Sequence, residues 1–170
     1  MEGGKKNEFI EQIAGKANEL QNQYGILPSI SMSQAILESN WGTSGLAVQN
    51  QNYYGIKGGS SEKEKQFRTK EYLEKSEEWI EIDASFRKYE SFEESMEDHA
   101  RLLVHGTRWN PDLYRDVVEA ADYEEAAHAL YAAGYATDPD YPQKLISLIE
   151  QYDLQRYDRP ENRERKDQDK

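Results

Sequence analysis

Apolar residues recur at intervals of three and four positions along most of this chain, and this period constrains its fold more than any other feature. The first such segment runs from Asn7 to Tyr24 and is followed by Gly25, which is typical of a helix end. A second helix is predicted from Pro28 until the Gly42–Gly45 segment. Later segments with one apolar stripe span Phe92 to His105, Pro111 to Ala120, Tyr123 to Ala133 (with Gly134 as its stop) and Pro139 to Tyr152.

The second predicted helix carries an acidic residue among apolar ones. Its stripe contains Ile30, Gln34, Leu37 and Trp41, and this spacing places Glu38 in its last turn.

Between the second and third helices the pattern changes to partial alternation. Gln66 to Leu73 and Glu78 to Tyr89 are rich in aromatic and β-branched residues and flank a polar EKSE turn. We predict a β-hairpin here. The expected fold class is therefore mainly α (α+β): a helical domain with a small β-hairpin lobe.

A chain of 170 residues has room for one domain. We expect residues 7–154 to form the domain and residues 1–6 to be a non-native remnant. Residues 155–170 have almost no apolar content, so we expect them to be a polar tail or linker. A monomer is expected.

Charge and composition exclude several classes of function. The net charge of −12 repels nucleic-acid phosphates, and no run of 18 apolar residues is present, so we expect neither nucleic-acid binding nor a membrane span. The absence of cysteine removes thiol chemistry. The three histidines are His99, His105 and His128, and their spacing does not match a metal-ligand motif. We therefore predict catalysis without a metal or cofactor.

Glu38 is the candidate catalytic acid. A glycosidase needs one carboxylic acid that stays protonated near neutral pH, and usually a second carboxylate. Apolar and aromatic surroundings raise the pKa of a carboxylic acid, and Glu38 has Ala35, Leu37 and Trp41 as predicted neighbours. The local pattern equally fits a solvated glutamate near a helix end.

Four motifs resemble one known family, in order and spacing. SMSQAILESNWGTSGLA is followed by NYYGIKG, then by FRKYESFEESMEDHARLL and AGYATDPDYPQKL. Together they resemble glycoside hydrolase family 73, the glucosaminidase domain of bacterial autolysins and of the flagellar muropeptide hydrolase. The resemblance implies a lysozyme-like fold whose hairpin flanks a cleft, with Glu38 as catalytic acid. It also implies peptidoglycan glycan strands as partner, endo-cleavage between N-acetylglucosamine and N-acetylmuramic acid, and an extracellular or wall-associated location.

The second carboxylate is predicted to be Glu71, because the family places this group in the β-lobe. Its side chain would share a strand face with Thr69 and Leu73. The competing candidates are Glu64, Glu74, Glu77 and Asp83. A solvated charge on an acidic hairpin is the alternative interpretation of Glu71.

Aromatic and amide side chains complete the predicted site. Tyr135 and Tyr141 are candidates for charge stabilisation and sugar contact, with core packing as the alternative. Asp138 is expected to cap a helix that begins at Pro139. Substrate binding is predicted for Trp41, Asn52 and Tyr54, for which packing is again the alternative.

Three other activities fit the same sequence. An N-acetylmuramidase or a lytic transglycosylase would use the same scaffold and glutamate. A non-catalytic wall-glycan binding module would keep the cleft without hydrolysis.

Overall fold

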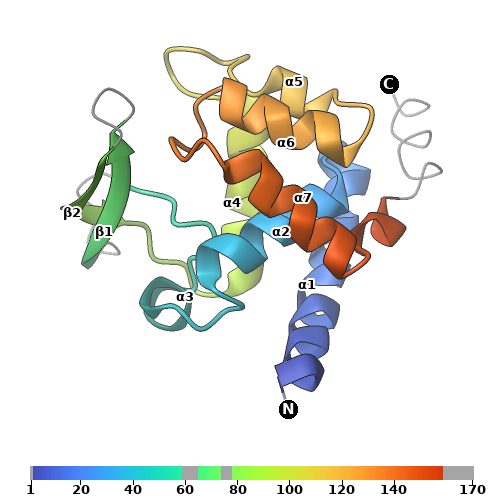
Figure 1. Ribbon diagram of the computed structural model, residues 1–170, viewed down its shortest axis with the longest axis horizontal. Helices are drawn as coiled ribbons and strands as arrows, with labels where there is room; N and C mark the ends of the chain where they lie inside the picture. Colours follow the sequence, from blue (N-terminus) through green and yellow to red (C-terminus); the bar gives the residue numbers. More distant parts are fainter. Residues whose placement is uncertain (1, 59–64, 74–77, 159–170) are drawn as a thin grey trace.

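The computed structural model describes the backbone of residues 2–58, 65–73 and 78–158, and the side chains of residues 4–58 and 85–158. These ranges form a mainly helical domain, which confirms the helical part of the predicted class (Figure 1). Within them, no helix is both long and apolar enough to cross a membrane. The elements are α1 (Glu2–Tyr24), α2 (Pro28–Ser39), α3 (Gly45–Asn50), β1 (Lys65–Leu73), β2 (Glu78–Phe86), α4 (Phe92–His105), α5 (Arg115–Val118), α6 (Tyr123–Ala132), α7 (Tyr141–Gln151) and the 3-10 helix η1 (Leu154–Tyr157).

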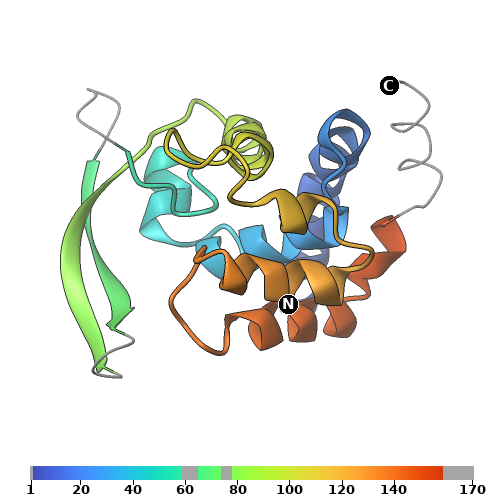
Figure 2. The same cartoon turned by 90° about the horizontal axis from the view of Figure 1, so that it is seen from above.

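Helix α2 lies at the centre of the helical body (Figures 1 and 2). It packs against α1, α4, α6, α7 and η1, and ten of its twelve residues are buried. Alternating small residues let the neighbouring helices approach it closely. The surrounding core is aliphatic, and its largest fully buried side chains are Ile10, Ile13, Leu20, Ile26, Ile30, Met32, Ile36, Met96, Leu103, Leu130, Leu145 and Ile149. A side chain on α2 is therefore held by a rigid support.

The first turn of α2 is capped by a residue from the other end of the sequence. Leu27 at the N-cap makes no side-chain hydrogen bond to this turn. Instead, the Asp158 carboxylate accepts hydrogen bonds from the Ser29 backbone N–H at 2.8 Å and from the Ser29 hydroxyl at 2.5 Å. A carboxylate there satisfies an orphan donor and interacts favourably with the helix dipole. Leu154, the first residue of η1, is fully buried.

Three helix starts differ from the prediction, and the first is that of α1, which begins at Glu2 instead of Asn7. The segment expected as one helix from Pro111 is helical only in α5, because residues 111–114 form turns. In these turns the N–H groups of Leu113 and Arg115 donate to carbonyls three residues earlier. Helix α7 begins at Tyr141, not at Pro139. The Asp138 carboxylate accepts from the Asp140 backbone N–H at 2.9 Å and pairs with Lys144, so it braces the turn before α7.

Helix α2 ends earlier than its apolar stripe predicted. Asn40 and Trp41 both have left-handed backbone conformations, with φ of 49° and 60°, so the chain turns away after Ser39. Trp41 is therefore not on the α2 stripe, and its ring does not have the predicted helical relation to Glu38. A short helix that was not predicted, α3, follows this turn and is capped by the Ser44 hydroxyl, which accepts from Ala47 N–H.

Strands β1 and β2 pair in antiparallel register, with Glu71 opposite Ile80. The pair lies at one end of the molecule, with α1 towards the other (Figures 1 and 2). Strand β2 ends at Phe86, three residues before the predicted end. Residues 74–77, which include the predicted turn, lie outside the described residues.

Candidate active site

Glu38 lies in the last turn of α2, as predicted, and its side chain is half-buried. The helix end beside it is closed by local hydrogen bonds. The Ser39 hydroxyl donates to the Ala35 carbonyl at 2.5 Å and accepts from the Gly42 N–H at 2.8 Å. These contacts close α2 at Ser39, the residue after Glu38.

Tyr141 contacts the Glu38 carboxylate directly. Its hydroxyl lies 2.9 Å from Glu38 Oε2 and 2.9 Å from Gln34 Nε2. Tyr141 is the first residue of α7 and only 3% exposed, so the packing of α7 against α2 brings the two groups together. Burial, followed by the negative charge of Glu38, raises the pKa of Tyr141 well above its ordinary value. The phenol therefore stays protonated and can donate a hydrogen bond at any working pH.

Tyr135 belongs to the same cluster of rings. It stacks on Tyr141 with centroids 6.0 Å apart and meets the rings of His99 and Tyr114 edge-on, each at 5.9 Å. Burial and the Glu38 charge raise the pKa of Tyr135 well above its ordinary value. The structure therefore brings Glu38, Tyr135 and Tyr141 together in one region.

The end of α6 sets the position of Tyr135. Gly134 has a left-handed conformation with φ of 85°, its N–H donates to the Tyr131 carbonyl, and the Tyr135 N–H donates to the Leu130 carbonyl. This pair of bonds is a Schellman motif, which needs a residue without a Cβ penalty at its left-handed position. The predicted helix stop at Gly134 is confirmed.

Two residues of this region were not predicted as site residues: Gln34 and His99. The Gln34 amide connects Tyr141 to His99, whose Nε2 lies 2.8 Å from Gln34 Oε1. Both side chains are fully buried. A signal for Gln34 exists in the sequence, because a polar residue on an apolar stripe one turn before Glu38 faces the same side of the helix.

Burial lowers the pKa of His99 to about 3, so its imidazole is neutral near neutral pH. Its ring stacks on Tyr54 at 3.8 Å between centroids. An unfolded chain protonates histidine near pH 6.5, whereas folded His99 resists protonation until about pH 3.

This difference predicts an acid-dependent loss of stability. Below pH 6.5 only the unfolded state gains the His99 proton, so the folded state should lose about 1.4 kcal/mol per pH unit from this residue. Denaturant unfolding between pH 7.5 and 4.5 measures the slope, and His99→Gln should have a shallower slope than the wild type. The control is His128→Gln, which makes the same change at an exposed position. Equal slopes for the wild type and His99→Gln would contradict the prediction.

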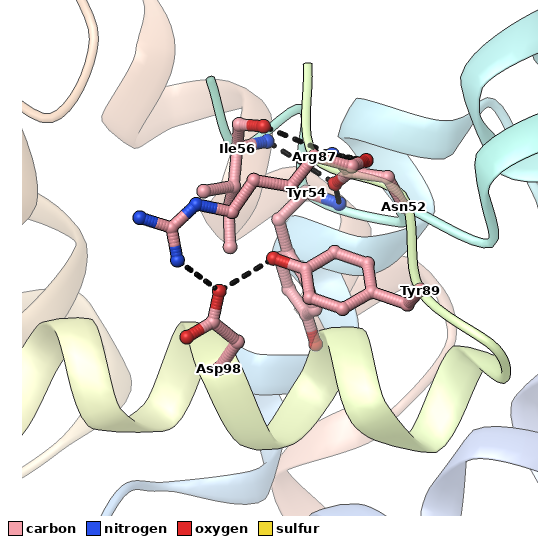
Figure 3. A network of polar contacts seen from close by, with 6 residues as sticks. All are labelled: Asn52, Tyr54, Ile56, Arg87, Tyr89 and Asp98. Carbon is pink, nitrogen blue, oxygen red and sulfur yellow. Dashed lines mark hydrogen bonds and ion pairs between the residues drawn. The ribbon is translucent and has the colours of Figure 1, made fainter. Parts of the chain in front are cut away.

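Asn52 holds the loop after α3 in place (Figure 3). It is 1% exposed, and its amide donates to the carbonyls of Ile56 and Arg87, both at 3.0 Å, and accepts from Ile56 N–H at 3.1 Å. Tyr54 is also buried, and its hydroxyl donates to the Ser31 carbonyl on α2 at 2.8 Å. Both side chains therefore support the loop and α2 from within the fold.

The same network extends to α4. Asp98 Oδ2 pairs with Arg87 at 2.9 Å and accepts from the Tyr89 hydroxyl at 2.5 Å (Figure 3). These contacts tie the segment after β2 to α4, and so to the helix that carries His99.

Trp41 packs away from the tyrosine cluster. Its ring meets Tyr152 edge-on at 4.9 Å and Phe9 at 6.0 Å, and the Lys6 ammonium lies 5.1 Å from its centroid. These contacts join the α2 end to α1 and to the end of α7.

Glu71 lies on β1, but its carboxylate is outside the described side chains, as is that of Asp83 on β2. Glu64, Glu74 and Glu77 lie outside the described residues. Among the described residues, no group of three or more histidine, aspartate or glutamate side chains could hold a metal ion.

Residues 14–154 match the protein family described as "Glucosaminidase: Mannosyl-glycoprotein endo-beta-N-acetylglucosaminidase". A structural match is the catalytic domain of the autolysin Auto from Listeria monocytogenes, with a TM-score of 0.79 and 39% identity, covering 91% of this chain and 88% of that one.

Two curated relatives are longer than this chain. Exo-glucosaminidase LytG of Bacillus subtilis is 49% identical over 150 residues, which is 88% of this chain and 52% of LytG. A probable N-acetylmuramidase of Lactococcus lactis is 40% identical over 153 residues, which is 88% of this chain and 34% of the relative. The chain thus spans about half of the first relative and about a third of the second.

Proposed function

The chain belongs to the glucosaminidase family, and from this premise we propose that it is a peptidoglycan hydrolase that cleaves the β-1,4 bond between N-acetylglucosamine and N-acetylmuramic acid. The observation that carries the proposal is the half-buried Glu38 at the end of α2, bound by the Tyr141 hydroxyl and beside Tyr135. Action on the wall implies an extracellular or wall-associated location. We further propose residues 7–154 as the catalytic domain.

Glu38 is the general acid of the proposed reaction. It donates its proton to the glycosidic oxygen while the bond from that oxygen to the anomeric carbon breaks, and the bonding electrons stay on the leaving oxygen. The sugar then carries positive charge at the anomeric carbon. The Tyr135 ring next to Glu38 offers a polarisable surface to that charge, and Tyr141 holds the carboxylate that forms.

Glu71 is the proposed second carboxylate, on a hairpin that we place beside the substrate cleft. As a base it would stand about 6.5–9.5 Å from Glu38 and activate a water, giving inversion; about 5–5.5 Å would give a covalent intermediate. In a third route the substrate's N-acetyl group attacks, and Glu71 orients it.

The other predicted binding residues, Asn52, Tyr54 and Trp41, have different roles in the proposal. The buried positions of Asn52 and Tyr54 support a role in shaping the cleft floor from below. Trp41 would contribute at the end of α2, where it is partly exposed beside Lys6 and Tyr152.

Cleavage at internal bonds is the proposed mode, and cleavage at chain ends is its alternative. The second mode has specific support, because the relative that is 49% identical is named an exo-glucosaminidase. A muramidase is the second candidate activity, since the Lactococcus relative carries that name.

Digestion of purified peptidoglycan separates these activities. After borohydride reduction and mass spectrometry, we expect reducing N-acetylglucosamine ends. Reducing N-acetylmuramic acid ends would identify a muramidase, and 1,6-anhydro ends a transglycosylase. Early products that are long glycan fragments support internal cleavage, whereas small terminal products alone would refute it. Sedimentation with the wall and no released product would indicate a binding module instead.

A further inference from the structure

Four side chains form one line of hydrogen bonds from the core to Glu38. His99 Nε2 contacts Gln34 Oε1 at 2.8 Å, Gln34 Nε2 contacts the Tyr141 oxygen at 2.9 Å, and the Tyr141 hydroxyl contacts Glu38 Oε2 at 2.9 Å. The first three are 3% exposed or less. Because each inner group has few partners available, the proton positions along the line depend on one another.

The inner end of the line fixes the tautomer of His99. Its Nδ1 is buried and has no hydrogen-bond partner among the described residues. A proton on Nδ1 would leave an unpaired N–H donor in the core, which is unfavourable because the donor loses its hydrogen bond to water. A proton on Nε2 is instead donated to Gln34 Oε1. Since burial keeps the imidazole neutral, His99 carries its single ring proton on Nε2.

The tautomer sets the orientation of Gln34. Its Oε1 accepts the proton from His99, so its Nε2 must face Tyr141 and donate to the phenol oxygen. The phenol has one proton, and the lone pair facing Gln34 is occupied. The Tyr141 proton is therefore directed to Glu38 Oε2.

We propose that Gln34 is a positioning residue for the general acid: it makes Tyr141 a hydrogen-bond donor to Glu38 Oε2 and so assigns the transferable proton to Oε1. Oε2 accepts from Tyr141 in both protonation states of Glu38. In the acid step the Oε1–H bond breaks, the proton joins the glycosidic oxygen and the electron pair remains on the carboxylate, where Tyr141 stabilises the charge. This inference rests on the proposed hydrolysis.

The pH dependence of activity tests the direction of the line. A donor to the carboxylate favours its ionised form, so Tyr141→Phe should move the alkaline limb of kcat/KM to higher pH by about one unit. Gln34→Met should move it in the same direction by less, and lower kcat by roughly three- to tenfold with KM unchanged. A shift to lower pH would mean that Tyr141 accepts from Glu38, and would overturn the proposal.

A double-mutant cycle tests whether Gln34 acts through Tyr141. In the Tyr141→Phe background, Gln34→Met should cause no further fall in kcat and no further shift of the limb. Additive effects would overturn the proposal. Gln143→Met is the matched control, because it makes the same change at an exposed position on α7 and should keep wild-type activity.

The tautomer of His99 can be measured without an activity assay. In protein labelled with ¹⁵N-histidine, the side-chain nitrogen shifts of His99 should report a protonated Nε2 and a bare Nδ1 between pH 5 and 8. A proton on Nδ1 would overturn the proposal even if Gln34→Met fails to fold. If Glu38→Gln keeps full activity while the Nε2 tautomer is observed, the proposed role of Glu38 as general acid fails and the hydrogen-bond line stands.

Discussion

Replacing Glu38 by glutamine should slow peptidoglycan hydrolysis by about 10²- to 10⁴-fold, the usual contribution of general acid catalysis. An amide has the size of the carboxyl group but no proton to give to the glycosidic oxygen. Its oxygen can still accept the Tyr141 hydroxyl, so the packing of α7 on α2 is preserved. The measurement is the initial rate at which purified cell walls release reducing ends, with thermal unfolding as the check on folding.

Glu8→Gln makes the same change at an exposed position on α1 and should hydrolyse walls at the wild-type rate. A folded Glu38→Gln enzyme that matches that rate would remove Glu38 from the mechanism.

Gly106→Ala should destabilise the protein by about 3 kcal/mol or more. Gly106 ends α4 with φ of 63° and ψ of −143°, a conformation essentially restricted to glycine. A Cβ at this position would also overlap the carbonyl oxygens of Asn110 and Pro111. Relief would require the turn after α4 to open, which would break the Gly106 N–H bond to the Leu102 carbonyl. The free energy of unfolding from urea titration measures the effect.

Gly15→Ala is the opposite case within the same protein. Gly15 lies inside α1, and nothing lies within 4 Å of the added Cβ, so this change should stabilise the fold by about 0.5–1 kcal/mol. If both substitutions changed the free energy of unfolding by a similar amount, the backbone conformation of Gly106 would not be the cause of the destabilisation.

The helices could be predicted because their signal is local. The apolar period of α1, α4 and α6 depends on residues within one segment, and the structure has helices there. The apolar period does not predict where a helix ends when tertiary contacts or turn geometry determine the backbone conformation. Trp41 continues the α2 stripe in sequence, yet the left-handed backbone at Asn40 directs it towards α1 and Tyr152.

The site was predictable only in part. Motif resemblance pointed to Glu38 and Tyr135 as candidate site residues, and the structure brings them together with Tyr141. The contact between Gln34 and His99 joins residues 65 positions apart, and no single-segment pattern carries that information. The second carboxylate is harder to predict, because the acidic hairpin offers several equivalent candidates. The side chains of these candidates lie outside the described ones.

The hydrogen bonds between Ser29 and Asp158 bear on where this domain can be cut. A recombinant fragment that stops at residue 154 contains every residue of the family match, yet lacks the carboxylate that caps α2. Since α2 also carries Gln34 and Glu38, the proposed acid, loosening its first turn weakens the support of both side chains. A recombinant fragment that keeps this support of Glu38 therefore includes Asp158.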